Sequence, residues 1–337
     1  MLEILSLLAL AVAGTAVVWK GSGWLESAAN RIAAGYGVPT IVQGAVIAAV
    51  GSSMPELVSV LLATLVHGEF ELGIGAIVGS AVFNLLVIPG VAVLASGDAG
   101  EGAPTTRDLV YKEALFYMLA VAALLLTFSL AVIYYPTGEG FDGTVTRTLA
   151  LFPLALYGLY VFTQYLETSE YDAPDVEVNT LRAWAWFGAG LVVIVVGVEA
   201  LVRAAIGLGD AFGTPAFLWG MIVVAAGSSV PDAFVSVSAA RAGRPTVSLA
   251  NVLGSNVFDL LVAVPAGVLV AGALTVSFAS VVPMMAFLIL ATVVFFAISR
   301  TGMELTEREA WLLLAMYGLF VAWLLAESVG AVNVIPA

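Results

Sequence analysis

With 61% hydrophobic and only 10% charged residues, the 337-residue chain cannot be a soluble globular protein, in which roughly a quarter of the residues are charged. The composition predicts a protein that crosses the membrane several times. The absence of cysteine excludes disulfides and thiolate metal sites. The net charge of −13 comes largely from acids in short polar connections, which fit either a host with a salty interior or ordinary acidic loops.

Apolar runs of about 20 residues, the length that crosses a hydrocarbon core of about 30 Å, recur along the chain. They predict ten membrane-spanning helices, in chain order at residues 2–20, 39–66, 72–96, 109–135, 145–165, 183–206, 215–240, 246–273, 277–299 and 308–327. The first run has no charged segment before it and no cleavage signal after it. We therefore expect a retained span and not a signal peptide.

The basic residues divide unevenly between the two sides if successive helices alternate in direction. Only Arg147 and Arg203 lie on one side. The other nine are Lys20, Arg31, Arg107, Lys112, Arg182, Arg241, Arg244, Arg300 and Arg308. By the positive-inside rule the side with nine is cytoplasmic. We expect a multi-pass protein of the cell (plasma) membrane with both termini extracellular.

The chain also repeats itself. Residues 35–60 align with 211–236 at an offset of 176, which places "GSSMPE" (51–56) on "GSSVPD" (227–232). At an offset of 175, "GSAVFNLL" (79–86) aligns with "GSNVFDLL" (254–261). Two blocks in the same order indicate an internal duplication.

Each copy contains five predicted helices, and because five is odd the second copy enters the membrane from the opposite face. The sequence thus predicts an all-α polytopic membrane protein, with ten transmembrane helices arranged as two inverted five-helix repeats. The predicted parts are a first repeat at 1–165 with its motif at 44–86, a cytoplasmic linker at 166–182, and a second repeat at 183–337 with its motif at 220–261.

Each "GSS" motif is followed by a proline inside an apolar run. Pro55 has no N–H for the carbonyl of Gly51, and Pro231 has none for the carbonyl of Gly227. A proline inside a helix removes one hydrogen bond and crowds a carbonyl, so we expect both helices to bend or break. Carbonyls freed in this way are tolerated in a membrane only where protein, water or an ion satisfies them.

The spacing of the polar residues predicts a cluster of oxygen atoms. Residues four apart lie on one face of a helix. Four pairs have this spacing: Ser52 and Glu56, Ser80 and Asn84, Ser228 and Asp232, and Ser255 and Asp259. The duplication brings the four faces together near the midplane of the membrane. The result is an all-oxygen site with three carboxylates, which suits hard cations such as Ca²⁺.

Serine and glycine at such spacing in a membrane helix are by themselves most often a sign of helix packing. A carboxylate at mid-bilayer is different, because burying it costs roughly 2.5–3.5 kcal/mol even on the lenient insertion scale. Among the 24 acids, Glu56, Asp232 and Asp259 alone lie deep within predicted spans and belong to the repeated motifs. These three carry the functional prediction.

Three further polar residues have ordinary structural interpretations. Glu199 lies in a predicted span four residues before Arg203, which favours an ion pair within the helix. His67 lies beside two glutamates in an outer connection and is expected to be solvated. Gln43 has Trp219 at the equivalent position of the second copy, and a hydrogen bond between helices is its expected role.

The motifs "AVGSSMPELVSV" with "GSAVFNLL", and "AAGSSVPDAFVSV" with "GSNVFDLL", resemble the two alpha repeats of the sodium/calcium exchanger family within the calcium/cation antiporters. The resemblance extends over essentially the whole chain and is to the compact prokaryotic members, without cytosolic calcium-sensing domains. It implies a transporter and not an enzyme. It also implies Ca²⁺ and Na⁺ as substrates within a lipid bilayer, without a cofactor, a nucleic acid or an obligate protein partner.

By position, the resemblance implies that Glu56 and Asp232 are the central carboxylates shared by calcium and sodium. It implies that the backbone carbonyls of Ala49 and Ala225 bind sodium. The remaining implied ligands are Ser52, Ser53, Ser80 and Asn84 in the first copy, with Ser228, Ser229, Ser255 and Asp259 in the second.

The sequence departs from the commonest prokaryotic pattern at three positions. Serine replaces threonine at 52 and 228, which keeps the hydroxyl, and aspartate replaces glutamate at 232. The shorter acid is expected to change relative ion affinities more than the set of ligands.

The charge count suggests a mechanism. Three carboxylates can be balanced by three sodium ions, or by one calcium ion with a proton or water arrangement, and the site is too small for both loads. Mutually exclusive occupancy predicts antiport, and the charge count predicts an electrogenic exchange of three Na⁺ for one Ca²⁺.

Two groups of alternatives stay open. On the same fold, the coupling ion could be a proton, or exchange could depend on potassium, as in some relatives with aspartate at the position of Asp259. A remote alternative is an intramembrane hydrolase with Ser52 or Ser228 as nucleophile. That activity needs a general base, and the chain's one histidine is His67 in a loop.

Overall fold

The computed structural model describes residues 2–36, 49–95, 103–104, 109–138, 140–168, 179–243, 245–332 and 334. Within these residues, nine helical segments are long and apolar enough to cross a membrane, and Met54–Leu65 is a shorter apolar helix. The helices of the first repeat are α1 (Leu2–Gly35), α3 (Ala49–Ser52), α4 (Met54–Leu65), α5 (Phe70–Ala95), the π-helical η2 (Leu109–Glu113), α6 (Ala114–Tyr134) and α7 (Arg147–Thr168).

The described helices of the second repeat include two π-helical turns. Its members are α8 (Thr180–Phe212), α9 (Ala216–Trp219), η3 (Gly220–Val224), α10 (Ala225–Arg241), α11 (Pro245–Phe258), η4 (Asp259–Ala263), α12 (Val264–Ala271), α13 (Phe278–Arg300) and α14 (Glu307–Ser328). Here η3 and η4 are π-helical turns that continue directly into the next α-helix. The predicted spans from residue 72 onward are confirmed to within three residues at each end, except that α8 continues six residues beyond the predicted end at 206.

The first predicted span differs from the structure, and the second lies partly outside the described residues. The first was predicted too short, because α1 continues to Gly35 and contains 34 residues, a length of about 50 Å at 1.5 Å per residue. Lys20 therefore lies near the middle of α1 and not at its end. Most of the first half of the predicted span 39–66, with Gln43, lies outside the described residues.

The predicted linker 166–182 is shortened at both ends, since α7 extends to Thr168 and α8 begins at Thr180.

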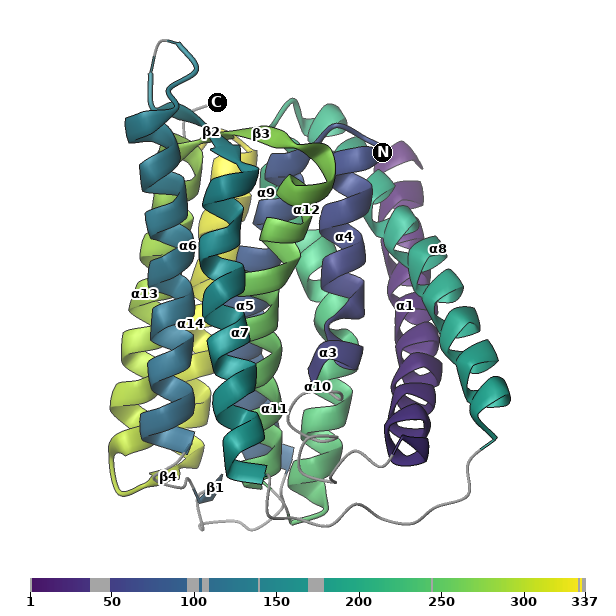
Figure 1. Cartoon of the computed structure of the whole chain (residues 1–337). Helices are drawn as coiled ribbons and strands as arrows, with labels where there is room; N and C mark the ends of the chain where they lie inside the picture. Colours follow the sequence, from purple (N-terminus) through teal and green to yellow (C-terminus); the bar gives the residue numbers. More distant parts are fainter. Residues whose placement is uncertain are drawn as a thin grey trace.

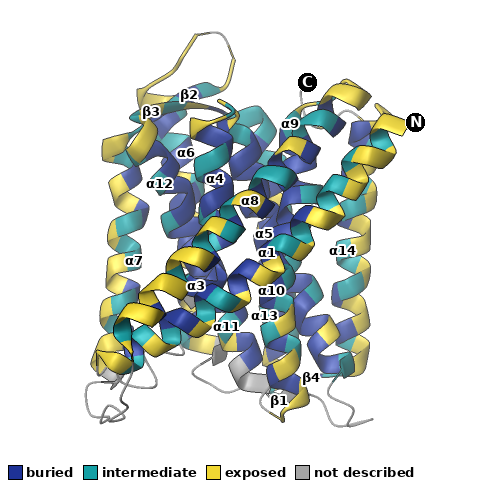
Figure 2. Cartoon of the chain, turned by 90° about the vertical axis from the view of Figure 1, so that its right-hand side faces the viewer, coloured by how far each residue is buried: buried dark blue, intermediate teal, exposed yellow. Residues whose placement is uncertain are grey.

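Glycines explain why α1 does not stop at Gly21. An added Cβ at Gly21 would lie 3.0 Å from the carbonyl oxygen of Gly190, and one at Gly14 would lie 2.9 Å from that of Gly197. The helices α1 and α8 thus approach each other at both positions, side by side along one flank of the bundle (Figure 1). Figure 2 shows this pair running obliquely across the front, with exposed residues on its outward face.

The same contacts demonstrate the inverted repeat. Gly14 and Gly21 pair with Gly197 and Gly190 in reverse order, so the two helices are antiparallel. With the sequence offset of 176, Gly190 is the repeat equivalent of Gly14, and Gly197 that of Gly21. Each contact is therefore the image of the other under a two-fold operation, as in an isologous interface.

Two short antiparallel sheets add to the predicted all-helical fold. One pairs β1 (Ala103–Pro104) with β4 (Glu304–Leu305), and the other pairs β2 (Asp142–Thr146) with β3 (Ala273–Ser277). The sheets lie at opposite ends of the molecule (Figure 1). Each joins a strand of one repeat to a strand of the other, so the two ends are inverted copies of one arrangement.

The described basic residues gather at one end. We call the end with β1 and β4 the basic end. Helices α1, α10 and α13 end there, and α6, α8 and α14 begin there, which brings basic residues near these helix ends together (Figure 1). Its described basic residues are Arg31, Lys112, Arg182, Arg241, Arg300 and Arg308. The chain begins at the opposite end, where α14 also finishes (Figure 1).

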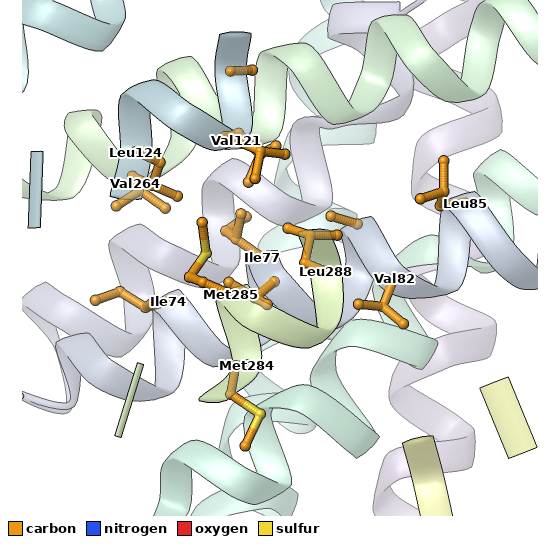
Figure 3. Close-up of a cluster of buried hydrophobic side chains, with 14 of the residues drawn as sticks. Ile74, Ile77, Val82, Leu85, Val121, Leu124, Val264, Met284, Met285 and Leu288 are labelled. Atoms are coloured by element: carbon orange, nitrogen blue, oxygen red, sulfur yellow. The ribbon is translucent and has the colours of Figure 1, made fainter. Parts of the chain in front are cut away.

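The core is built around α5, which is buried along most of its length. Figure 3 shows Ile74 and Ile77 of α5 packed with side chains of α6, α12 and α13, among them Val121, Val264 and Leu288. All five side chains are at most 3% exposed. A helix that is apolar on every side is expected in the centre of a membrane protein. The polar residues of α5 are therefore held in a rigid, water-poor position.

Candidate functional site

The first "GSS" motif interrupts its helix. The helix α3 ends at Ser52 and α4 begins at Met54, while Ser53 between them has non-helical torsion angles of φ −86° and ψ 5°. Pro55 then occupies the first turn of α4, where its missing N–H would have had no helical partner. The predicted break is present, and it places Glu56 in the first turn of the new helix.

The second motif behaves differently. Helix α10 runs without interruption from Ala225 to Arg241 with Pro231 inside it, so of the two predicted outcomes, a bend or a break, the break does not occur here. Gly227 packs closely here, because an added Cβ would lie 2.7 Å from the side chain of Leu201 and 2.8 Å from the hydroxyl of Thr15. Contacts with α8 and α1 hold the helix together across the lost hydrogen bond. The irregular turn of this repeat lies earlier, in η3.

Helix α5 brings acids of the two repeats to one face. Ser80 Oγ lies 3.4 Å from Glu56 Oε1, to which it donates, and 2.8 Å from Ser229 Oγ. One turn later, Asn84 Nδ2 donates to Asp232 Oδ2 at 3.2 Å. Since Ser80 and Asn84 are four residues apart on one helix, Glu56 and Asp232 face the same side of α5. The two acids are also close enough to interact electrostatically.

The serines form a second link between the repeats. Ser52 Oγ lies 3.1 Å from Ser255 Oγ, and Ser53 Oγ donates to the carbonyl of Ser255 at 3.4 Å. Ser229 Oγ donates to Glu56 Oε1 at 3.5 Å. Every one of these contacts crosses from one copy of the motif to the other, as the duplication predicts.

The two alanines proposed to contribute carbonyls occupy matching places. Ala49 is the first residue of α3 and Ala225 is the first residue of α10, each three residues before the first serine of its motif. The carbonyl of Ala225 accepts a hydrogen bond of 3.3 Å from Ser228 Oγ. Ala225 O and Ser228 Oγ are therefore adjacent oxygens in the second copy.

Asn256 belongs to this network but was missed in the sequence. It accepts from Asn84 Nδ2 at 3.0 Å through Oδ1, and its Nδ2 donates to the carbonyl of Ala81 at 3.2 Å. Ala81 is the residue of the first copy that is equivalent to Asn256 at the offset of 175. The available signal was an amide inside "GSNVFDLL" where the first copy has alanine. We infer that Asn256 orients the amide of Asn84 toward Asp232.

Several oxygens of the cluster form no hydrogen bond of standard geometry in the described structure. Glu56, Asp232 and Asp259 are at most 1% exposed. In the described part of the chain, Glu56 Oε2, Asp232 Oδ1, Asn84 Oδ1 and both carboxylate oxygens of Asp259 have no hydrogen-bond partner. Buried polar atoms without partners are costly and uncommon in folded proteins. Oxygens of this kind are the ligands that a hard cation takes.

Asp259 stands apart from the other two acids. It begins the π-helical turn η4 and interacts electrostatically with Glu56 and Asp232. Among the described residues, however, no three acid, histidine or cysteine side chains are grouped closely enough to hold one metal ion. An ion here would thus take its remaining ligands from hydroxyl, amide and backbone oxygens.

A separate group of polar residues lies toward the end of the molecule opposite the basic end. The predicted ion pair within α8 is present, with Arg203 Nε 2.6 Å from Glu199 Oε1. The prediction of a merely solvated histidine was wrong, because His67 Nε2 lies 3.0 Å from Glu199 Oε2. The residues are 132 positions apart, so only folding places them together.

The arrangement can be compared with known proteins. The sequence pattern described as "Sodium/calcium exchanger protein" matches residues 6–166 and 182–326. An uncharacterized membrane protein of Methanocaldococcus jannaschii, MJ0091, is 26% identical over 310 residues, which cover 92% of this chain and 95% of that protein. The sodium/calcium exchanger MaX1 of Methanosarcina acetivorans is 26% identical over 284 residues, covering 73% and 78% of the two chains.

The fold is also found among solved structures. The sodium-calcium exchanger NCX_Mj, soaked with 2.5 mM Na⁺ and 10 mM Sr²⁺, matches with a TM-score of 0.64 at 22% sequence identity. The match covers 95% of this chain and 99% of the other. It shows that the two proteins share a polytopic helical fold.

Proposed function

Because this chain belongs to the sodium/calcium exchanger protein family, we propose that it is a secondary active antiporter that exchanges Na⁺ for Ca²⁺ by alternating access. One observation carries the proposal. Glu56 and Asp232, from oppositely inserted copies, are buried on the same face of α5, and each has a carboxylate oxygen without a hydrogen-bond partner in the described structure.

The chemistry of the cluster favours these ions. Its side-chain donors are carboxylate, hydroxyl and amide oxygens, without sulfur, and Ca²⁺ takes six to eight oxygen ligands from groups of this kind. Glu56 and Asp232 serve both ions in this proposal. The other proposed ligands are Ser52, Ser53, Ser80, Asn84, Ser228, Ser229, Ser255 and Asp259, with the backbone carbonyls of Ala49 and Ala225.

Charge balance supports exchange over simple permeation. Three buried carboxylates are costly when no cation is bound, so the protein moves between its inward- and outward-open forms only when it is loaded. Three Na⁺ or one Ca²⁺ can fulfil that requirement, but not both together. An exchange of three Na⁺ for one Ca²⁺ moves one net charge, to which the membrane potential contributes about 2.3 kcal/mol per 100 mV.

The proposed orientation follows from the basic end. Six described basic residues lie there, and the positive-inside rule assigns that end to the cytoplasm of a plasma-membrane protein. Both termini are then extracellular, since the chain begins and α14 finishes at the other end (Figure 1).

The hydrolase alternative lacks a histidine base, and the acids near the two serines, Glu56 and Asp232, belong to the proposed ion-binding cluster. Ser228 Oγ donates to the carbonyl of Ala225, and Ser52 Oγ pairs with Ser255. The single histidine of the sequence, His67, pairs with Glu199 and is not a partner of either serine. A serine nucleophile needs a base within hydrogen-bonding distance, so these serines are better suited to binding ions.

Uptake of radioactive calcium into proteoliposomes tests the coupling ion. We expect uptake to require an outward sodium gradient and to accelerate under an inside-positive potential, because three positive charges leave for every two that enter. Uptake that follows a pH gradient and ignores sodium would indicate a calcium/proton antiporter. An absolute requirement for potassium would indicate the potassium-dependent alternative.

A further inference from the structure

A second site lies between α1 and α8 near the basic end. A cavity of about 280 Å³ is lined mainly by Trp24, Ser27 and Arg31 of α1 and by Arg182 and Trp186 of α8. It lies between the final turns of α1 and the first turns of α8, beyond the close contact at Gly21 and Gly190. None of the proposed ion ligands lines it.

The cavity combines positive charge with aromatic surface. Arg31 and Arg182 are both exposed, and within the described ranges neither of them forms an ion pair. The rings of Trp24 and Trp186 meet edge to face with centroids 5.3 Å apart. Lys20 Nζ lies 5.6 Å from the ring of Trp24 and adds a third positive charge. The fork of N–H donors on arginine matches the oxygens of a phosphate.

The internal symmetry shows that the fold does not require this group of residues. At the offset of 176, the repeat equivalents of Trp24 and Arg31 are Ala200 and Gly207. The equivalents of Arg182 and Trp186 are Ser6 and Leu10. The other end of the same helix pair therefore has small and apolar residues in place of both arginines and both tryptophans. Packing of α1 on α8 accounts for the glycines but not for this cluster.

We propose that the cavity binds the phosphodiester headgroup of an anionic glycerophospholipid. Arg31 and Arg182 hold the phosphate oxygens, and the glycerol and upper acyl chain lie against Trp24 and Trp186. Tryptophan is enriched at the level of lipid headgroups, and basic residues at that level attract anionic lipids. Because one arginine comes from each repeat, the bound lipid ties the ends of α1 and α8 together.

Native mass spectrometry of the full-length protein tests the site, after extraction from vesicles of equal parts phosphatidylglycerol and phosphatidylcholine. We expect the wild type to retain phosphatidylglycerol in preference to phosphatidylcholine. Arg31→Gln and Arg182→Gln should each lower that retention about fivefold, and the double variant about thirtyfold. Arg300→Gln, which removes an arginine of the same end from α13, is the matched control and should retain the lipid fully.

Two further arms make the result decisive. A double variant with lysine at both positions keeps the charge, and it should retain more lipid than the glutamine pair, which separates charge from any damage to folding. Retention of phosphatidylglycerol by the glutamine pair at the wild-type level would overturn the proposal. So would displacement of the lipid by excess inorganic phosphate, because the site would then be one for free phosphate.

Discussion

The two halves of the molecule are alike where α1 packs against α8, but they differ at two positions of the ion-site cluster, Asn84 with Asp259 and Ala81 with Asn256. Gly14 with Gly197 and Gly21 with Gly190 are images of one contact, and the two small sheets are images of one pairing. Packing of this kind depends on close approach of the two helices at small residues, which a duplicated gene supplies twice. Symmetry is therefore retained at the contacts that hold the halves together.

The ion-site cluster shows the opposite behaviour. Asn84 of the first copy donates to Asp232, but its equivalent Asp259 forms no hydrogen bond of standard geometry in the described structure, although the Ser53 hydroxyl lies near it. Ala81 of the first copy is replaced by Asn256 in the second, and the two are in direct contact. A symmetric cluster would have had either two asparagines or two further acids. Substitutions after duplication thus gave one cluster both an amide donor and an additional negative charge.

The largest effect is expected at the two equivalent acids, Glu56 and Asp232, which have the same proposed role in the two halves. Glu56→Gln and Asp232→Asn should each reduce sodium-dependent calcium uptake by roughly a hundredfold or more, because removing one charge from a buried charged cluster costs about 3–5 kcal/mol. Uptake into sodium-loaded proteoliposomes measures this, and Glu307→Gln on exposed α14 is the control. Full activity in either acid variant would contradict the shared role.

The next test makes the halves more alike. Asp259→Asn gives the second copy the asparagine that the first has at Asn84, and it removes an acid that forms no hydrogen bond of standard geometry in the described structure. We expect about a tenfold loss of uptake at low sodium, equivalent to about 1.4 kcal/mol. The sodium concentration for half-maximal exchange should rise more than that for calcium. A rise confined to calcium would place Asp259 at the calcium ion instead.

A stability test examines the symmetric contacts. Gly21→Ala and Gly197→Ala are repeat equivalents, and each added Cβ would lie 2.8–2.9 Å from atoms of the facing helix. Overpacking of this degree lowers the free energy of unfolding by about 1–3 kcal/mol. Both variants should therefore have a lower melting temperature in detergent, and the two decreases should be similar. Gly23→Ala is the matched control, since its Cβ would meet nothing within 4 Å.

The smallest expected effect concerns the residue that differs most between the copies. Asn256→Ala restores the alanine of the first copy and removes the acceptor of Asn84 and the donor to Ala81. Only the bond with Asn84 involves a proposed ion ligand, and the loss of that one neutral hydrogen bond, about 1 kcal/mol, corresponds to about a fivefold loss of calcium affinity. Equilibrium binding of calcium to the purified protein measures it. An unchanged affinity would show that Asn84 is oriented without Asn256.

The sequence by itself determined the class of protein, the spans after residue 72, the duplication and the acids of interest. These follow from local properties, namely the length of apolar runs and the high cost of placing Glu56, Asp232 or Asp259 in lipid. The odd number of helices in each copy was enough to predict inversion.

Only the tertiary structure decided the rest. It showed that α1 continues past Gly21, that α10 continues through Pro231, and that Asn256 and His67 have partners far away in the chain. Such outcomes depend on what faces a residue in space, because a glycine or a proline next to a neighbouring helix behaves differently from the same residue alone. Hydrophobicity is a local property of the chain, but a partner more than a hundred residues away is set by packing.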